Sequence, residues 1–219
     1  MNLADYIQKD LNPITLELTI AEVKNRFIQI RHSHLPVVED KRLIGLIAES
    51  DLVTLEEDSK EVADFTYLFE SFFATEEDDW INLLHLFARN ESNLLPLLDT
   101  NKYYIGYYDL NDVLLFYSDT PFLNEEGIVL VVEKDNLHYN FSEIAQIVET
   151  NNGKLLGSLI TETTQSNTQI TLKIKSESIN EIIQSFRRYE YRIVSKHRDD
   201  SYLEDLKNRS EYLQKYLNV

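Results

Sequence analysis

Residues 35–51 read LPVVEDKRLIGLIAESD, and residues 95–112 read LPLLDTNKYYIGYYDLND. Pro36 and Pro96 lie 60 residues apart, and after one inserted residue near Asn101 the glycines and final aspartates lie 61 apart. Each stretch contains an apolar run with a proline, polar turn residues, a second apolar run around a glycine, and an aspartate. Because short apolar runs separated by turn residues are typical of paired strands, the sequence predicts two copies of one supersecondary motif.

The same spacing continues upstream, where each copy is predicted to have a helix. Thr19 and Asp79 lie 60 residues apart, and both residue types accept backbone hydrogen bonds at helix N-termini. Glu22 completes a capping box with Thr19, and Asn82 stands at the equivalent place. The apolar spacing that follows is helical: Ile20, Val23, Phe27 and Ile30 in the first copy, and Ile81, Leu84, His85 and Ala88 in the second.

Each copy is therefore predicted to run strand, helix, strand, strand, helix, and we call the copies the first repeat (about residues 8–56) and the second repeat (about 70–118). Residues 56–70 join them, and a linker helix and the first strand of the second repeat are expected there. Ser118 to Pro121 is rich in turn residues and marks a domain boundary. The paired strands are Leu35–Val38 with Leu43–Ile47, and Leu94–Leu98 with Tyr103–Tyr107.

Residues 119–198 follow a different pattern, strand, helix, strand, strand, helix, strand, which predicts a ferredoxin-like βαββαβ domain and an α+β fold class overall. Residues 199–219 have the apolar spacing of an amphipathic helical tail. The first helix of the ferredoxin-like domain, Ser142–Thr150, is expected to end in a left-handed turn at residues 151–153. The predicted elements are strand Gly127–Val132, helix Ser142–Thr150, strands Leu155–Ile160 and Thr168–Ile174, a helix with a capping box of Ser178 and Glu181, and strand Tyr191–Ser195.

The composition narrows the classes of partner. The formal net charge of −17 opposes binding to nucleic-acid phosphates and to anionic lipid surfaces. The chain has no cysteine, which excludes disulfides, thiolate metal sites and thiol nucleophiles. It shows neither a signal-peptide pattern nor an apolar run long enough to span a membrane. We therefore expect a cytoplasmic protein that binds neither nucleic acid nor membrane.

The duplicated motif resembles the CBS domain, which usually occurs in pairs and binds adenine nucleotides in clefts between the two copies. In that family a strand-end Thr or Ser and an Asp after the glycine strand bond the ribose hydroxyls. Asp51 and Asp112 hold the aspartate position, whereas Ala48 and Asp109 stand where the hydroxyl is expected. The resemblance also adds residues near the strand starts to the ligand set: Thr15, Leu35, Pro36, Leu95 and Pro96.

This ligand set has a second interpretation. Asp51 and Asp112 could instead cap the helices that follow them. In the family a basic residue often precedes the aspartate and faces phosphate, but Ser50 and Asn111 stand there in this chain. That change predicts weaker phosphate binding, and a carboxylate at Asp109 would repel phosphate.

The pattern also indicates roles for three histidines and two leucines. His32 and His34 alternate at a strand entry, a spacing that can hold a metal ion, but no third ligand accompanies them and no metal site is predicted. His85 is expected to line the core from the apolar face of its helix. The side chains of Leu35 and Leu95 are expected in the core, so that their backbone groups face a purine.

The C-terminal domain resembles the ACT domain, a regulatory module that often binds amino acids at interfaces. In that family an Asp/Asn-x-x-Gly turn receives the carboxylate, because glycine lets backbone N–H groups approach it. The turn at Asp135–Asn140 has no glycine, which favours a dimerising or structural role. The whole plan resembles acetoin-utilisation-type CBS regulatory proteins.

These observations favour a non-catalytic regulatory protein, because the sequence lacks a Gly-rich phosphate loop, a G-x-S-x-G elbow and an H-E-x-x-H pair. The first hypothesis is a sensor that binds an adenosine-containing ligand, an adenine nucleotide or S-adenosylmethionine, in the cleft of the CBS pair, with no resident cofactor. The alternative is a ligand-free interaction or assembly scaffold, which Ala48 and Asp109 favour. A homodimer is expected because residues 113–116 are all apolar and wrap more than one face of a short helix.

Overall fold

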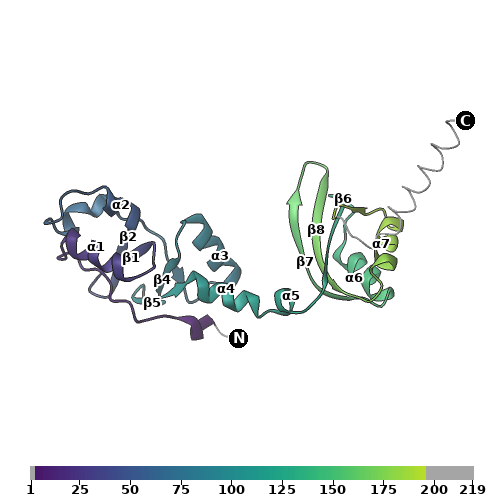
Figure 1. The fold of residues 1–219 in the computed structure, drawn as a ribbon, viewed down its shortest axis with the longest axis horizontal. Helices are drawn as coiled ribbons and strands as arrows, with labels where there is room; N and C mark the ends of the chain where they lie inside the picture. The colour runs from purple at the N-terminus through teal and green to yellow at the C-terminus, as the bar shows by residue number, and fades with distance from the viewer. Residues whose placement is uncertain (1–2, 196–219) are drawn as a thin grey trace, which may run out of the picture. The chain divides into compact units, whose positions relative to one another are not determined.

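The computed structural model describes residues 3–195, which divide into two compact units, one ending at Ser118 and the other beginning at Asp119. Unit 1 contains two copies of a small αβ motif, and unit 2 contains a four-stranded antiparallel sheet with two helices on one face (Figure 1). The α+β class predicted from the sequence is confirmed. The predicted tail at residues 199–219 lies outside the described residues.

The first repeat follows the predicted order. Ile14 forms a parallel bridge to Val37, so the first strand is reduced to a single bridge. Thr19 caps the helix that follows and forms the predicted capping box with Glu22. The elements are η1 (Leu3–Tyr6), α1 (Ile20–Gln29), β1 (His34–Glu39), β2 (Arg42–Ala48) and α2 (Glu49–Val53).

The second repeat copies this arrangement in detail. Asp79 caps its first helix, as predicted, by accepting from the backbone N–H of Asn82. The strand register shifts between Val37 and Val38 in the first repeat and between Leu97 and Leu98 in the second, which are equivalent positions. The elements are the 3₁₀ linker helix η2 (Val62–Leu68), β3 (Ala74–Thr75), α3 (Trp80–Arg89), β4 (Leu94–Leu98), β5 (Tyr104–Asp109) and α4 (Leu110–Ser118).

The buried face of α3 differs from the prediction. Leu83 and Phe87 are buried, as are Val23 and Phe27 at the equivalent positions of α1. The predicted stripe included Ile81, which is 62% exposed, and also His85 and Ala88, which are exposed. His85 therefore does not line the core, and this assignment was wrong because α3 is apolar on several faces and its spacing permits more than one stripe.

The two repeats exchange their leading segments. Gln8 pairs with Tyr107 of β5, and Glu70 pairs with Leu46 of β2, so each repeat adds one residue to the sheet of the other. These close approaches explain why both repeats have glycine at this place: a Cβ at Gly106 would meet the carbonyl oxygen of Gln8, and one at Gly45 would lie 2.8 Å from Cβ of Phe69. The exchange therefore joins the repeats into one body.

Unit 2 has the ferredoxin-like strand order β7-β8-β6-β9, as predicted for an ACT-like domain. Alternate residues of β8 are buried under the two helices, and the core gathers on that face. A short helix, α5 (Pro121–Asn124), precedes the sheet. The other elements are β6 (Ile128–Asp135), α6 (Phe141–Thr150), β7 (Lys154–Thr163), β8 (Asn167–Lys175), α7 (Ile179–Arg188) and β9 (Arg192–Ile193).

The helix ends of unit 2 test two local predictions. The left-handed stop after α6 is confirmed, and the left-handed residue is Asn152, with φ of 55°. The capping box before α7 is wrong, because the side chain of Ser178 makes no capping hydrogen bond. Its backbone N–H instead donates to the hydroxyl of Ser176.

Candidate functional site

A cleft of about 540 Å³ lies between the two repeats of unit 1. His34 pairs with Ala48, so the start of β1 and the end of β2 reach the same edge of the sheet. The C-terminal end of α3, from the second repeat, forms the opposite wall. We call this the first cleft, and it is lined by Ser33, His34, Ala48, Glu49, Ser50, Glu70, Arg89, Asn90 and Glu91.

A hydrogen-bonded histidine forms the buried wall of the first cleft. His34 is only 6% exposed, and its ring lies edge-on to Phe72 with 5.4 Å between centroids. Its Nδ1 lies 2.9 Å from Oγ of Ser33, and its Nε2 lies 3.4 Å from Oε1 of Glu70. The backbone N–H of Ser33 donates to Oδ1 of Asn93 at 2.8 Å, which ties this wall to the second repeat. The wall is therefore held from both repeats.

The charged groups of the first cleft were missed by the sequence analysis. Glu49, Glu70 and Glu91 contribute three carboxylates, and Arg89 contributes one guanidinium. Arg89 forms no ion pair with any residue that the structure describes. The lining therefore has an excess of negative charge and one cation that no acid among residues 3–195 pairs.

Asp51 follows the lining residue Ser50 in the chain, but it is not one of the residues that line the first cleft. It is partly exposed inside α2, and its carboxylate makes no hydrogen bond or ion pair within residues 3–195. The N-cap position of α2 is Ala48. The interpretation of Asp51 as a helix cap is therefore wrong, and its carboxylate is a free acceptor one residue beyond Ser50.

The equivalent polar groups of the second repeat are already engaged, and we call this group the second site. Oδ1 of Asp109 accepts from the backbone N–H of Asn111 at 2.7 Å, at the start of α4, and Oδ2 lies 3.6 Å from Nδ1 of His32. Oδ2 of Asp112 accepts from Nε2 of Gln8 at 2.8 Å. The helix-capping interpretation of Asp112 is therefore wrong too, because Asp109 bonds the start of α4.

The remaining predicted site residues do not gather at the first cleft. Thr15 follows Ile14, and the parallel pairing of Ile14 with Val37 directs the chain toward the opposite end of β1 from His34. Thr15 therefore lies away from the cleft. The side chains of Leu35 and Leu95 are fully buried, as expected, and the neighbouring Pro36 and Pro96 are buried strand residues.

His32 and His34 do not act together. The ring of His32 faces Asp109 and stacks edge-on against Tyr107, whereas the ring of His34 faces Glu70. Within residues 3–195, no group of three His, Asp or Glu side chains is placed to hold a metal ion.

The polar groups of the turn after β6 in unit 2 are hydrogen-bonded within the turn and, through Asn136, to Thr164, Ser166 and Thr168. Oδ1 of Asp135 accepts from the backbone N–H of Leu137 at 2.9 Å and lies 3.0 Å from Nδ1 of His138. These contacts hold the pKa of Asp135 below its usual value, chiefly through the backbone hydrogen bond from Leu137. Oδ1 of Asn140 accepts from the backbone N–H of Ser142 and caps α6.

The comparison with protein families identifies the first repeat. The CBS domain family matches residues 3–58. Residues 3–58 form a CBS domain. The second repeat has the same element order, caps and register shift, so unit 1 is a CBS domain pair. No match was found among curated proteins.

Several solved structures match about half of this chain. One is a CBS domain pair/ACT domain protein from Thermotoga maritima, with 24% identity, a TM-score of 0.47, and coverage of 53% of this chain and 96% of that protein. Another is CBSX2 in complex with AMP, with 17% identity, a TM-score of 0.46, and coverage of 53% and 95%. The cytosolic domain of the Mg²⁺ channel MgtE in complex with ATP has 18% identity, a TM-score of 0.45, and coverage of 52% and 48%.

The search for membrane-spanning helices gave a negative result for the described part of the chain. None of its helices combines the length and the apolar character that a span requires.

Proposed function

We propose that unit 1 is a non-catalytic sensor that binds one adenosine-containing ligand in the first cleft. The observation that carries this proposal is a cleft of about 540 Å³ in a CBS domain pair, lined by Ser50, the residue before Asp51, whose carboxylate has no hydrogen bond or ion pair within residues 3–195. Clefts of roughly 300–1,000 Å³ hold small organic ligands. A carboxylate has enough lone pairs to accept from both hydroxyls of a ribose, which is the role proposed for Asp51.

The second site is not proposed to bind ligand. Its two carboxylates already accept hydrogen bonds from Asn111 and Gln8. A ribose at Asp112 would have to displace Gln8, whose backbone also pairs with β5. The displaced amide would lose a hydrogen bond, which costs about 1 kcal/mol or more.

Ligand binding changes stability, which gives the first test. Ligand at 100 times its dissociation constant adds about 2.7 kcal/mol to the free energy of unfolding, or very roughly 5–10 °C in melting temperature for a chain of this size. Adenosine, AMP, ATP and S-adenosylmethionine are the compounds to screen. Asp51→Ala is expected to abolish the shift and to leave the unliganded melting temperature within a few degrees.

The alternative function, a ligand-free scaffold, is separated by the same screen. It is favoured by Ala48, which offers no hydroxyl, and by Asp109, which is committed to the start of α4. The control is Asp112→Ala, which removes the equivalent carboxylate from the second site. If none of the four compounds at millimolar concentration raises the melting temperature, the ligand-free scaffold is the better account. If Asp51→Ala and Asp112→Ala lose the ligand-induced shift equally, the ligand does not bind specifically in the first cleft.

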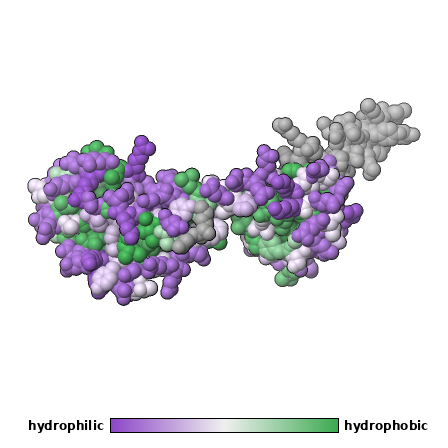
Figure 2. Space-filling view, turned by 90° about the horizontal axis from the view of Figure 1, so that it is seen from below, coloured by the Kyte–Doolittle hydropathy of each residue, from purple (hydrophilic) through white to green (hydrophobic). Residues whose placement is uncertain are grey.

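We also propose that the chain forms a homodimer through helices of unit 1. Apolar side chains remain exposed on α3 and α4, where Ile81 is 62%, Leu114 48% and Leu115 61% exposed. Figure 2 shows apolar surface gathered in patches between hydrophilic regions. A two-fold partner would cover such a patch with its own copy.

Light scattering coupled to size exclusion tests the dimer. A mass near 25.7 kDa at micromolar concentration would contradict it. Leu115→Glu is expected to split the dimer, because it places a charge in an apolar contact. Deletion from Asp200 onward is expected to leave the dimer intact.

For unit 2 we propose a structural or dimerising role without free amino-acid binding. The turn at Asp135–Asn140 lacks glycine; Asp135 accepts within the turn, Asn136 bonds to Thr164 and Thr168, and Asn140 caps α6. Calorimetry with the twenty amino acids is expected to show no saturable heat. A stoichiometric heat from any of them would refute this role.

A further inference from the structure

We infer that the charges of the first cleft select the ligand, so that adenosine derivatives with an uncharged or positively charged 5′ group bind and phosphorylated derivatives are rejected. This inference rests on the proposed function, because it assumes that an adenosine-containing ligand occupies the first cleft. It assigns a specificity role to Glu49, Glu70 and Glu91, which line that cleft.

The carboxylates give the first part of the argument. Glu49 and Glu91 form no ion pair with any residue from 3 to 195. Glu70 lies 3.4 Å from Nε2 of His34 and keeps 42% of its side chain exposed to the cleft side and solvent. A phosphate placed among these groups would meet three negative charges and one positive charge, that of Arg89. Unfavourable charge pairs of this kind reject one ligand class without improving the contacts to another.

The helix ends give the second part. Phosphate sites commonly use a helix N-terminus, where free backbone N–H groups and the positive end of the helix dipole meet the anion. The first cleft instead receives the C-terminal end of α3, where Arg89, Asn90 and Glu91 line the wall. At α2, the first helical residue is Glu49, so a carboxylate already stands at that helix N-terminus. Neither helix end favours a phosphate.

Arg89 explains how a zwitterionic ligand would fit. Its guanidinium, which has no ion pair within residues 3–195, can bind one carboxylate in bidentate geometry. A sulfonium nucleoside that carries an amino-acid group, such as S-adenosylmethionine, has two positive charges for the glutamates and one carboxylate for Arg89. The ligand class that matches the lining is therefore an adenosine derivative with net positive charge.

The test is a set of calorimetric titrations of the full chain at low salt with S-adenosylmethionine, adenosine, AMP, and ATP with and without Mg²⁺. We expect S-adenosylmethionine to bind at least as tightly as adenosine, and AMP to bind at least about tenfold more weakly than adenosine, because each partly exposed charge pair changes affinity by up to about fivefold. High salt should reduce the difference between the affinities for adenosine and AMP, since salt screens exposed charges.

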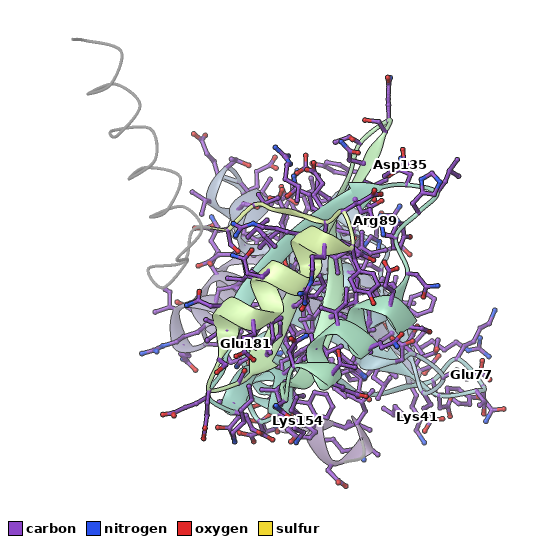
Figure 3. The ribbon with its side chains drawn as sticks, turned by 90° about the vertical axis from the view of Figure 1, so that its right-hand side faces the viewer. Lys41, Glu77, Arg89, Asp135, Lys154 and Glu181 are labelled. Atoms are coloured by element: carbon purple, nitrogen blue, oxygen red, sulfur yellow. The ribbon has the colours of Figure 1, made fainter. Side chains whose placement is uncertain are left out.

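Substitutions of the three glutamates test whether they cause the preference for adenosine over AMP. The triple change Glu49→Gln, Glu70→Gln and Glu91→Gln is expected to bring AMP to within about threefold of adenosine, and Glu91→Gln alone should move AMP in the same direction if the triple variant does not fold. Glu77→Gln is the matched control, because Glu77 is exposed in the same unit and lies well away from Arg89 (Figure 3). The Glu77→Gln variant should leave the affinities for AMP and adenosine unchanged.

The outcomes separate the two proposals. If AMP or Mg²⁺-ATP binds as tightly as adenosine or more tightly, the charge selection is wrong while the proposed function stands. If none of the compounds binds, the proposed function fails and this inference fails with it. If the order is as expected but Glu77→Gln changes it as much as Glu91→Gln does, the overall charge of the chain and not the cleft selects the ligand, and the inference is overturned.

Discussion

The two repeats of unit 1 share one fold and use their equivalent polar residues differently. In the first repeat, Asp51 follows the cleft residue Ser50, and its carboxylate has no hydrogen bond or ion pair within residues 3–195. In the second, Asp112 accepts a hydrogen bond from Gln8, and Asp109 bonds the backbone of α4. The segments that cross the two sheets differ at this place: Gln8, an amide that can donate, pairs with β5, and Glu70, an acid that cannot donate when ionised, pairs with β2. Among the residues that the structure describes, only Gln8 is hydrogen-bonded to the aspartate of the repeat that it crosses.

The largest expected losses in the free energy of unfolding come from substituting the glycines at the two places where one repeat crosses the sheet of the other, Gly106 and Gly45. Gly106→Ala is expected to lower the free energy of unfolding of unit 1 by about 4 kcal/mol, because the new Cβ meets the carbonyl oxygen of Gln8 and φ of 144° is strained for any L-residue. Gly45→Ala should cost about 1–3 kcal/mol, because it adds only close packing against Phe69. Urea unfolding followed by the fluorescence of Trp80, the single tryptophan, measures both. A larger loss for Gly45→Ala than for Gly106→Ala would contradict the account of the crossings.

The two aspartates should differ in their effect on stability. Asp112→Ala is expected to lower the free energy of unfolding by about 1 kcal/mol, because it removes a hydrogen bond and leaves the amide of Gln8 without its acceptor. Asp51→Ala should change it by less than about 0.5 kcal/mol, since its carboxylate has no partner to lose. The same urea titration compares them. Equal losses would show that Asp51 has a structural role.

A hydroxyl at the strand end should sharpen the difference between the repeats. Ala48→Ser places a hydroxyl in the lining of the first cleft and is expected to raise ligand affinity about threefold to tenfold, the value of one hydrogen bond. Calorimetric titration with the tightest-binding adenosine compound measures the change. Asp109→Ser is the matched control at the second site and should leave affinity unchanged. If Asp109→Ser raises affinity and Ala48→Ser does not, the ligand occupies the second site.

The fold of unit 1 could be predicted because its signals are local and occur twice. Local residues determine the helix caps at Thr19 and Asp79 and the hairpins that contain Pro36 and Pro96. Because the spacing is constant, the prediction for each repeat supports the prediction for the other. The strand order of unit 2 followed in the same way from its alternation of strands and helices. The buried face of α3 was mistaken although the spacing contained it, because Val23 and Phe27 plus 60 residues point to Leu83 and Phe87.

The site was less predictable because its contacts are long-range. Gln8 and Asp112 are 104 residues apart, and no local pattern indicates that the leading segment of one repeat crosses the sheet of the other. The same crossing brings Glu70 to the first cleft, and the end of α3 brings Arg89 and Glu91. The place of Thr15 relative to the first cleft likewise depends on pairing with Val37 and not on its own sequence.

The central claim is that the first repeat binds ligand and the second does not, and the stoichiometry of binding tests it most directly. Calorimetric titration of the full chain with S-adenosylmethionine or adenosine is predicted to give one ligand per chain, with binding lost in Asp51→Ala and retained in Asp112→Ala. Two ligands per chain, or one ligand lost in Asp112→Ala and retained in Asp51→Ala, would contradict the account.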